Sequence, residues 1–162
     1  FRVEKINTHG GSLRIYVKKG QKIKIEKNVK DILKEEENFG LKKVETYKNF
    51  GEKVYQIRKN VIKNLKKLKK TNKTIIGYGS PAKATTALNF FGLTNEIDFV
   101  VEDNKLKHGK FIPGVKIKIK HKSSIPKNKS IILVLAWNFF NEIKKNNSNL
   151  SNNFVNIKDL EK

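Results

Sequence analysis

The spacing of hydrophobic and polar positions changes along the chain, and its first changes predict a hairpin and a short helix. Residues 1–17 alternate between apolar and polar side chains around the glycine-containing segment 9–12, which favours two short strands joined by a turn. In residues 28–39 the apolar side chains recur on one helical face, with Asn28 as the expected N-cap and Gly40 as the expected C′ residue. The hairpin resembles the edge of a sheet whose other strands lie elsewhere.

A long amphipathic helix is expected between residues 45 and 70. Apolar side chains recur there at alternating steps of three and four, and lysines fill the other face. A helix of this length would span about 39 Å, which is enough to bridge two domains. Packing of the apolar stripe in a core is the expected role, and a basic helix for a membrane surface or a partner protein is the alternative. The stripe consists of Tyr47, Phe50, Val54, Ile57, Val61, Leu65 and Leu68.

From residue 74 onward, short apolar runs alternate with helical segments. The turn 77–80 follows the first run, and Pro81 is expected as the first residue of the next helix. Asn138 is expected to cap a second helix that ends near Lys145. This alternation predicts an α/β fold with a mostly parallel sheet covered by helices. The expected strands are 74–76, 97–101, 130–137 and 154–157, and the expected helices are 82–91 and 138–145.

The composition limits the size and class of the molecule. A chain of 162 residues with 37% hydrophobic residues can bury one principal core and a short appendage. The absence of cysteine excludes disulfides, thiolate zinc sites and a cysteine nucleophile in this segment. No apolar stretch approaches the roughly 18 residues that a membrane helix needs, and no signal-peptide pattern opens the chain. We therefore expect a soluble, cytoplasmic protein without membrane contact, cut from a larger chain at Phe1.

The net charge of +21 changes the range of expected partners. Such an excess is compatible with nucleic acid, with an anionic small molecule, or with a solvated basic surface that reflects compositional bias. The cations are almost all lysine, since the arginines are Arg2, Arg14 and Arg58. Base readout and bidentate phosphate binding favour arginine, so nucleic acid is the less favoured partner.

The candidate ligand site lies where the strands of a parallel sheet end. The segment Gly77–Lys83 joins two glycines to a helix N-terminus, and Lys83 adds a charge about one turn into the helix. Ala82 stands at the third glycine position of the Gly-x-Gly-x-x-Gly pattern, where alanine is tolerated. Asp103 follows the next strand, where an acid takes ribose hydroxyls in dinucleotide folds. A purely structural turn and a capping Asp103 remain open alternatives.

Two further loops end at the same predicted edge. The loop 104–115 concentrates lysines, among them Lys107 and Lys110, around a glycine turn that either closes over a phosphate or remains a solvated loop. Trp137 and Asn138 follow the third strand, where Trp137 either stacks on a base or fills the core. The three histidines have no metal-ligand spacing, and no Ser-His-Asp arrangement is evident. The segment therefore has no complete catalytic or metal site.

Read together, several segments in order resemble the C-terminal domain of the S-adenosylmethionine-dependent sugar C-methyltransferases. The resemblance extends over residues 6–145, and it implies a Rossmann-like three-layer domain preceded by a hairpin and a long helix. Ser80 stands where alanine is common in the family, and Ala84 where glycine is common. The segments are Thr8–Arg14, Gly77–Lys83, Leu88–Gly92, Lys107–Gly114 and Leu135–Asn138.

The resemblance implies a three-domain enzyme, with a zinc module and an S-adenosylmethionine-binding domain upstream. Such enzymes remove a proton beside the ketone of a nucleotide-linked deoxyketosugar, and the enolate attacks the methyl sulfonium. The family's zinc, cofactor and proton-abstraction residues lie upstream of this segment, so none is assigned here. Residues 1–27 would be the terminal hairpin of the preceding methyltransferase domain, 28–71 a helical linker, and 72–162 the C-terminal domain.

The residues expected to bind the nucleotide-diphosphate sugar share the predicted carboxyl edge of the sheet. His9 and Ser12 are expected to face the upstream methyltransferase domain. S-adenosylmethionine would bind mainly outside this segment, and none would bind tightly to it alone. The expected substrate-binding residues are Gly77, Tyr78, Gly79, Ser80, Lys83, Asp103, Lys107, Lys110 and Asn138.

Two other classes of function remain open from the sequence. One is an autonomous nucleotide- or NAD-binding module, which would retain tight binding without other domains. The other is a basic nucleic-acid-binding or scaffold protein, whose affinity would fall steeply with salt. A homodimer is also considered, because the unpaired hairpin could pair with a second copy.

Overall fold

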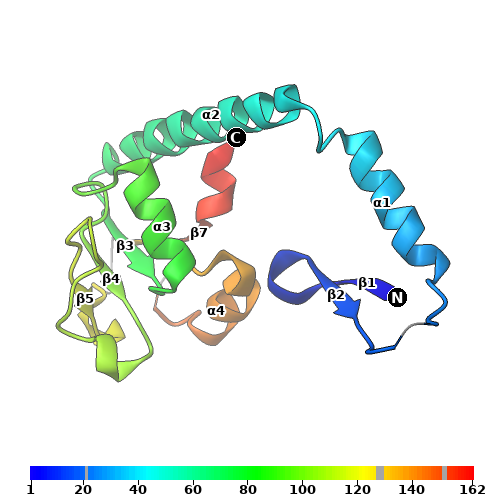
Figure 1. The fold of residues 1–162 in the computed structure, drawn as a ribbon. Coiled ribbons are helices and arrows are strands. Elements are labelled where there is room, and N and C mark those ends of the chain that lie inside the picture. The colour runs from blue at the N-terminus through cyan, green and yellow to red at the C-terminus, as the bar shows by residue number, and fades with distance from the viewer. Residues whose placement is uncertain (21, 127–129, 151–152) are drawn as a thin grey trace. The chain divides into compact units, whose positions relative to one another are not determined.

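A computed structural model describes residues 1–20, 22–126, 130–150 and 153–162 (Figure 1). The chain divides into two compact units, Phe1–Val54 and Tyr55–Lys162.

The first unit begins with the predicted hairpin. Strands β1 (Arg2–Ile6) and β2 (Ser12–Tyr16) pair antiparallel, with Val3 opposite Ile15. A single 3-10 turn at Thr8–Gly10 joins them, which confirms the expected strand–turn–strand pattern.

Helix α1 (Lys27–Phe39) packs on β1. The prediction that Asn28 is the N-cap is wrong, because the helix already begins at Lys27 and Glu26 occupies the cap position. The side-chain amide of Asn28 instead donates to the backbone oxygen of Val3 at 2.8 Å, so this residue ties the helix to the hairpin. Gly40 ends the helix with φ of 82°, as predicted for a C-terminal glycine.

Helix α2 (Val44–Lys69) is the predicted long amphipathic helix. Its apolar stripe is buried at Val61 and Leu65, which are fully inaccessible to solvent. Earlier in the same helix, the stripe residues Tyr47 and Phe50 are 55% and 66% exposed. The expectation of a packed stripe therefore holds for the second half of the helix only.

The second unit is built on a five-stranded, fully parallel sheet. The spatial order is β5-β4-β3-β6-β7, so the chain moves outward from β3 through β4 to β5 and then returns to the other side of β3. The direction of winding thus reverses between β3 and β6, which is where ligands bind in open α/β sheets. The strands are β3 (Thr74–Tyr78), β4 (Phe99–Val101), β5 (Ile119–Lys120), β6 (Ser130–Val134) and β7 (Phe154–Asn156).

Helices cover both faces of this sheet, as the α/β prediction requires (Figure 1). Apolar side chains of α2 and α3 (Ala82–Phe91) share one core cluster with residues such as Ile75. On the opposite face, α4 (Phe140–Asn146) contributes Phe140 and Ile143, which pack against strand residues of a second cluster. Alternate strand residues thus point into two cores, and the unit has three layers.

The C-terminal 3-10 helix Ile157–Glu161 is fastened to α2 by two side-chain amides. Asn60 donates to the backbone oxygen of Glu161 at 2.9 Å, and Asn64 donates to that of Leu160 at 3.1 Å. These two hydrogen bonds hold the C-terminal segment against α2.

Several local predictions need correction. Asn138 does not cap α4, because it lies within the 3-10 turn Trp137–Phe139 and the helix begins at Phe140 without a side-chain cap. Pro81 occupies the N-cap of α3, one position before the predicted one, since the helix begins at Ala82. The strand expected through Trp137 ends at Val134.

Strand β5 was not predicted, because the expected basic loop ends at Val115 and the residues after it were assigned to no strand or helix. Val115, Ile117 and Ile119 are buried, and a lysine follows each of them. This period of two is the usual signal of a strand with one buried face. The pattern was not recognised because the alternating polar positions are all lysines.

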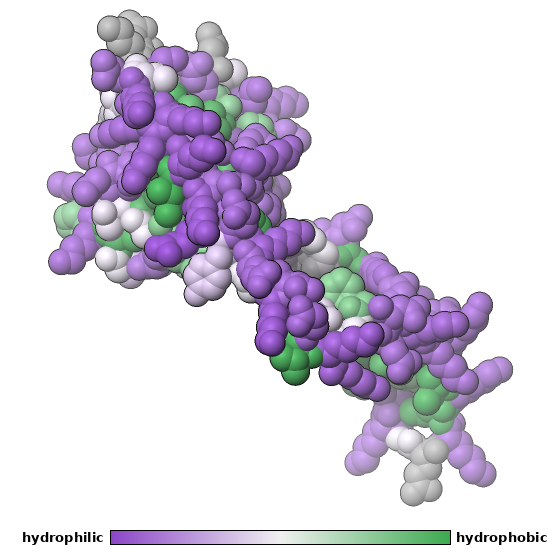
Figure 2. Space-filling model, turned by 90° about the horizontal axis from the view of Figure 1, so that it is seen from above, coloured by the Kyte–Doolittle hydropathy of each residue, from purple (hydrophilic) through white to green (hydrophobic). Residues whose placement is uncertain are grey.

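Hydrophilic side chains cover most of the face seen in Figure 2, as the lysine-rich composition leads one to expect. Across the described part of the chain, none of the helices combines the length and the hydrophobicity that a membrane span needs.

Candidate functional site

The turn after β3 lies at the point where the winding of the sheet reverses. Gly79 has φ of 86°, and its N–H donates to the backbone oxygen of Val101 at 2.8 Å. A methyl group at this position would lie 3.0 Å from the Cβ of Ala136, in the loop after β6. Glycine is therefore required both for the backbone conformation and for the close approach of the two loops.

Gly77 lies inside β3 rather than in the turn. A Cβ at Gly77 would come within 2.8 Å of side-chain atoms of both Val100 and Leu135. These two side chains fill the space above the glycine, so packing within the core accounts for the residue at this position.

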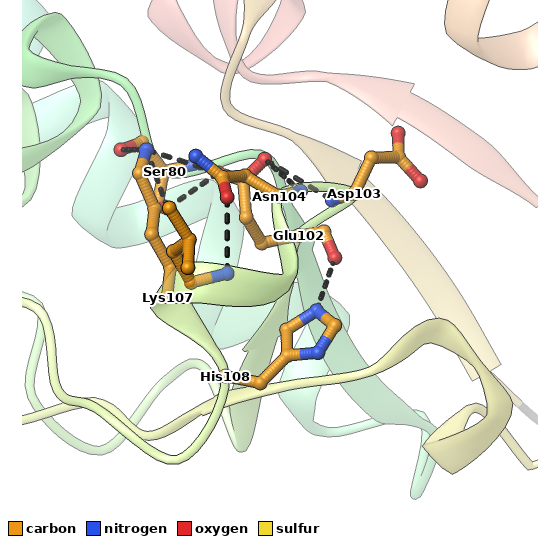
Figure 3. A network of polar contacts seen from close by, with 7 residues as sticks. Ser80, Glu102, Asp103, Asn104, Lys107 and His108 are labelled. Carbon is orange, nitrogen blue, oxygen red and sulfur yellow. Dashed lines mark hydrogen bonds and ion pairs between the residues drawn. The ribbon is translucent and has the colours of Figure 1, made fainter.

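Glu102, directly after β4, is the centre of the polar network at this edge (Figure 3). Its carboxylate accepts hydrogen bonds from the backbone N–H of Ser80 at 2.8 Å and from the Ser80 hydroxyl at 2.5 Å. The backbone N–H groups of Asp103 and Asn104 donate to its other oxygen at 3.1 and 3.3 Å. One carboxylate thus connects the turns that follow two neighbouring strands.

Lys107 and His108 complete the network from the next loop. The Lys107 ammonium donates to the backbone oxygen of Ser80 at 3.0 Å and forms an ion pair with Glu102 at 3.3 Å. The Nε2 atom of His108 lies 2.7 Å from the backbone oxygen of Glu102, to which the ring donates. The predicted site residues Ser80 and Lys107 are therefore brought together, with Glu102 between them.

The electrostatics of this network keep Glu102 ionised. Burial alone would raise the pKa of its carboxyl group. The hydrogen bonds from Ser80 and Asn104 and the positive charge of Lys107 outweigh burial, and the pKa is lowered below its usual value. The carboxylate is therefore an internal anion at the start of α3.

Tyr78 and Asp103 form a second polar pair at the same edge. The buried Tyr78 hydroxyl donates to Asp103 at 2.8 Å, and Lys122 lies 3.4 Å from the other carboxylate oxygen. Burial, together with the nearby Asp103 charge, raises the pKa of Tyr78 well above its ordinary value. The Asp103 side chain remains 61% exposed, so it has room for another hydrogen-bond donor.

The other predicted residues lie on exposed parts of the second unit. Lys83 is exposed in the first turn of α3, and Lys110 is exposed in the loop before β5. Asn138 is exposed after β6, while Trp137 is half-buried and packs against the core cluster that α2 and α3 share. Trp137 therefore fills core, one of the two roles predicted for it.

The remaining candidate residues lie elsewhere in the chain. His9 and Ser12 belong to the first unit, where the Ser12 hydroxyl donates to the backbone oxygen of Thr8 at 3.0 Å. Within the described residues, no group of histidine, cysteine or carboxylate side chains is arranged to hold a metal ion. An open groove of about 360 Å³ lies at the amino edge of the sheet, away from the network, and is lined by Lys66, Lys69, Lys70, Asn95 and Glu96.

The turn after β3 does not fit S-adenosylmethionine. The N–H and hydroxyl of Ser80 already bond to Glu102, and Ala136 lies against Gly79. The carboxylate of S-adenosylmethionine would have to displace the internal carboxylate to reach these donors. That S-adenosylmethionine binds mainly outside this segment stays a prediction.

Sequence reasoning missed Glu102 and His108. Both neighbour residues that the sequence pointed out, since Glu102 precedes Asp103 and His108 follows Lys107. The signal for Glu102 was its place at the end of β4, beside the strand that carries the glycine turn. The dinucleotide pattern favoured Asp103, but Glu102 is the acid that contacts the turn.

A parallel sheet in this order, with helices on both faces and a glycine turn at the reversal point, defines a Rossmann-like α/β domain. The chain belongs to the family described as the C-methyltransferase C-terminal domain, whose model matches residues 7–156. The match covers the turn and second strand of the hairpin and the whole parallel sheet, and it confirms the resemblance inferred from the sequence.

One relative is the C-methyltransferase NovU of Streptomyces niveus, which is 29% identical to this chain over 150 residues. The match covers 89% of this chain and 35% of the relative. The chain thus spans about a third of the length of that protein.

Proposed function

We propose that residues 72–162 are the substrate-side domain of an S-adenosylmethionine-dependent C-methyltransferase that acts on a nucleotide-linked deoxyketosugar. The observation that carries the proposal is the family match over residues 7–156. In this proposal, residues 1–27 belong to the upstream methyltransferase domain, with His9 and Ser12 facing it.

The diphosphate of the substrate would bind beside α3 rather than on Ser80. Glu102 already takes the Ser80 donors and neutralises part of the Lys107 charge. Lys83 and the first turn of α3 would therefore contact the anion, since a helix N-terminus favours negative charge. Lys110 would add a long-range attraction, and Asp103 and Asn138 would accept and donate hydrogen bonds to the sugar or ribose.

The chemical steps would take place outside this chain. Removal of the proton beside the sugar ketone, and transfer of the methyl group to that carbon, would use the upstream domain. The role of the present residues would be to bind the nucleotide, orient the sugar and exclude water. The strongly basic surface would also raise the rate at which an anionic substrate arrives.

The test is calorimetric titration of this chain with nucleoside diphosphates, a nucleotide sugar, S-adenosylmethionine and NAD. We expect binding of the nucleotide diphosphates alone, weakened at least about tenfold by Lys83→Ala, since loss of a charged hydrogen bond costs roughly 1.5–3 kcal/mol. Lys70→Ala, at the opposite edge of the sheet, is the matched control and should leave binding unchanged.

The titration also distinguishes the competing functions. Preferential binding of NAD would favour an autonomous nucleotide-binding module instead. Nucleic acid is therefore added to the ligands, and binding of it that is unchanged in Lys83→Ala and falls steeply with salt would favour a basic scaffold. Either result would contradict the proposal.

A further inference from the structure

The first unit has almost no interior of its own. Among its described residues, only Val3 and Gly40 are buried. The second unit, by contrast, has two clusters of buried apolar side chains. A folded domain of about 60 residues normally buries about 60% of the surface that its unfolded chain exposes. With so few buried residues, the first unit lacks a source of hydrophobic stabilisation.

The apolar side chains that would build such an interior are present but exposed. Five of them lie on α1 and on the first half of α2, with exposed fractions between 55% and 71%. We call this set the helical apolar residues. They are Leu33, Phe39, Val44, Tyr47 and Phe50.

The hairpin adds to this exposed surface. Leu13 and Ile15 on β2 are 46% and 67% exposed, and the two strands pair only with each other within the described residues. An isolated two-stranded hairpin is marginally stable in water. Unpaired strand edges and exposed apolar side chains therefore occur in the same hairpin. Both features are typical of a surface that another part of a protein covers.

We propose that residues 28–50 form an interface with the part of a longer chain that precedes residue 1. The inference rests on the proposed function, and it changes the role of this segment from linker to interface. Burial of the helical apolar residues would supply the hydrophobic stabilisation that the first unit lacks.

The preceding chain is favoured as the occupant by two observations. The family is a C-terminal domain, and the match covers only 35% of the relative NovU, so relatives carry additional chain. Phe1 pairs with the hairpin through a hydrogen bond from its amine to the backbone oxygen of Tyr16 at 3.0 Å. A segment entering through Phe1 would therefore be held at high effective concentration beside the first unit.

A second copy of this chain is the less favoured occupant. Each copy carries a net charge of +21, and two such copies repel each other. This charge therefore opposes self-association.

The test is amide hydrogen exchange of residues 28–50, measured in the 162-residue chain and in the longer protein. We expect at least tenfold slower exchange in the longer protein, and loss of that protection in the double variant Phe39→Ser, Phe50→Ser. Phe111→Ser is the matched control, because Phe111 is 56% exposed in the second unit and should leave protection unchanged.

Equal exchange in the two proteins would overturn the inference. So would protection that appears in the 162-residue chain as its concentration rises, together with a dimer in sedimentation, since this would assign the surface to a second copy. Failure of the proposed function is distinguishable, because nucleotide-sugar binding is tested at Lys83 in the other unit. Retained binding without protection would overturn the interface alone, and protection without binding would overturn the substrate role alone.

Discussion

The carboxylate of Glu102 accepts both the backbone N–H and the hydroxyl of Ser80, at 2.8 and 2.5 Å. Ser80 follows β3 and Glu102 follows β4, so the pair joins the carboxyl ends of two neighbouring parallel strands. The turn that precedes α3 is thereby fixed by the protein itself, before any ligand is bound. Glu102 is therefore the residue that holds the turn before α3 in place at the candidate site.

Glu102→Gln should destabilise the second unit. The substitution keeps the shape of the side chain but removes the negative charge that accepts four hydrogen bonds and pairs with Lys107. We expect a loss of about 1–3 kcal/mol in the free energy of unfolding. Urea unfolding should show a lower midpoint with an unchanged slope.

Glu52→Gln is the matched control for this loss, because Glu52 is exposed on α2. It should change the free energy of unfolding by less than about 0.5 kcal/mol. If the two variants proved equally stable, Glu102 would not hold the turn as described.

The acid stability of the protein should depend on Glu102. Because its pKa is lower in the folded state than the ordinary value of 4.5, its contribution is fully present above pH 4.5. That contribution is lost as the pH falls through the lower folded pKa. Urea midpoints measured between pH 7 and pH 3 should therefore show the difference between wild type and Glu102→Gln shrinking below about pH 4.5. A difference that grew in acid would contradict the assignment.

Gly77→Ala should destabilise the sheet. The added methyl group would meet side-chain atoms of Val100 and Leu135 at 2.8 Å, and overpacking of this kind costs about 1–3 kcal/mol. Thermal unfolding should show a lower midpoint for this variant.

Gly51→Ala is the control for the same chemical change. Gly51 lies within α2, and a Cβ there would meet nothing within 4 Å. Alanine is the better helix former by up to about 1 kcal/mol, so this variant should be as stable as wild type or more stable. A loss of stability at Gly51 that matched the loss at Gly77 would exclude the packing explanation.

Sequence reasoning predicted those parts of the fold that have a clear local period. The hairpin, the long helix and the segments around β3 and β6 carry runs or alternations that depend on local sequence alone. Strand β5 was missed because lysines alternate with Val115, Ile117 and Ile119, and charge obscured the period. The exposure of Tyr47 and Phe50 was also beyond reach, since helical periodicity shows that a stripe exists but not what covers it.

The candidate site was predicted in its location and only partly in its chemistry. The order of strands and glycines placed it at the carboxyl edge near Ser80 and Lys107, and the structure brings these two residues together. Glu102, at the centre of the polar network, was not predicted, because its contacts depend on how β3 and β4 pair in space. Tertiary pairing of this kind leaves no periodic mark in the sequence.

Methyl transfer from S-adenosylmethionine to a nucleotide-linked deoxyketosugar, followed in the longer protein, tests the central claim most directly. In Lys83→Ala we predict that KM for the nucleotide sugar rises about tenfold while KM for S-adenosylmethionine is unchanged, because Lys83 contacts only the sugar nucleotide in our account. An increase in the KM for S-adenosylmethionine with no change for the nucleotide sugar would contradict it.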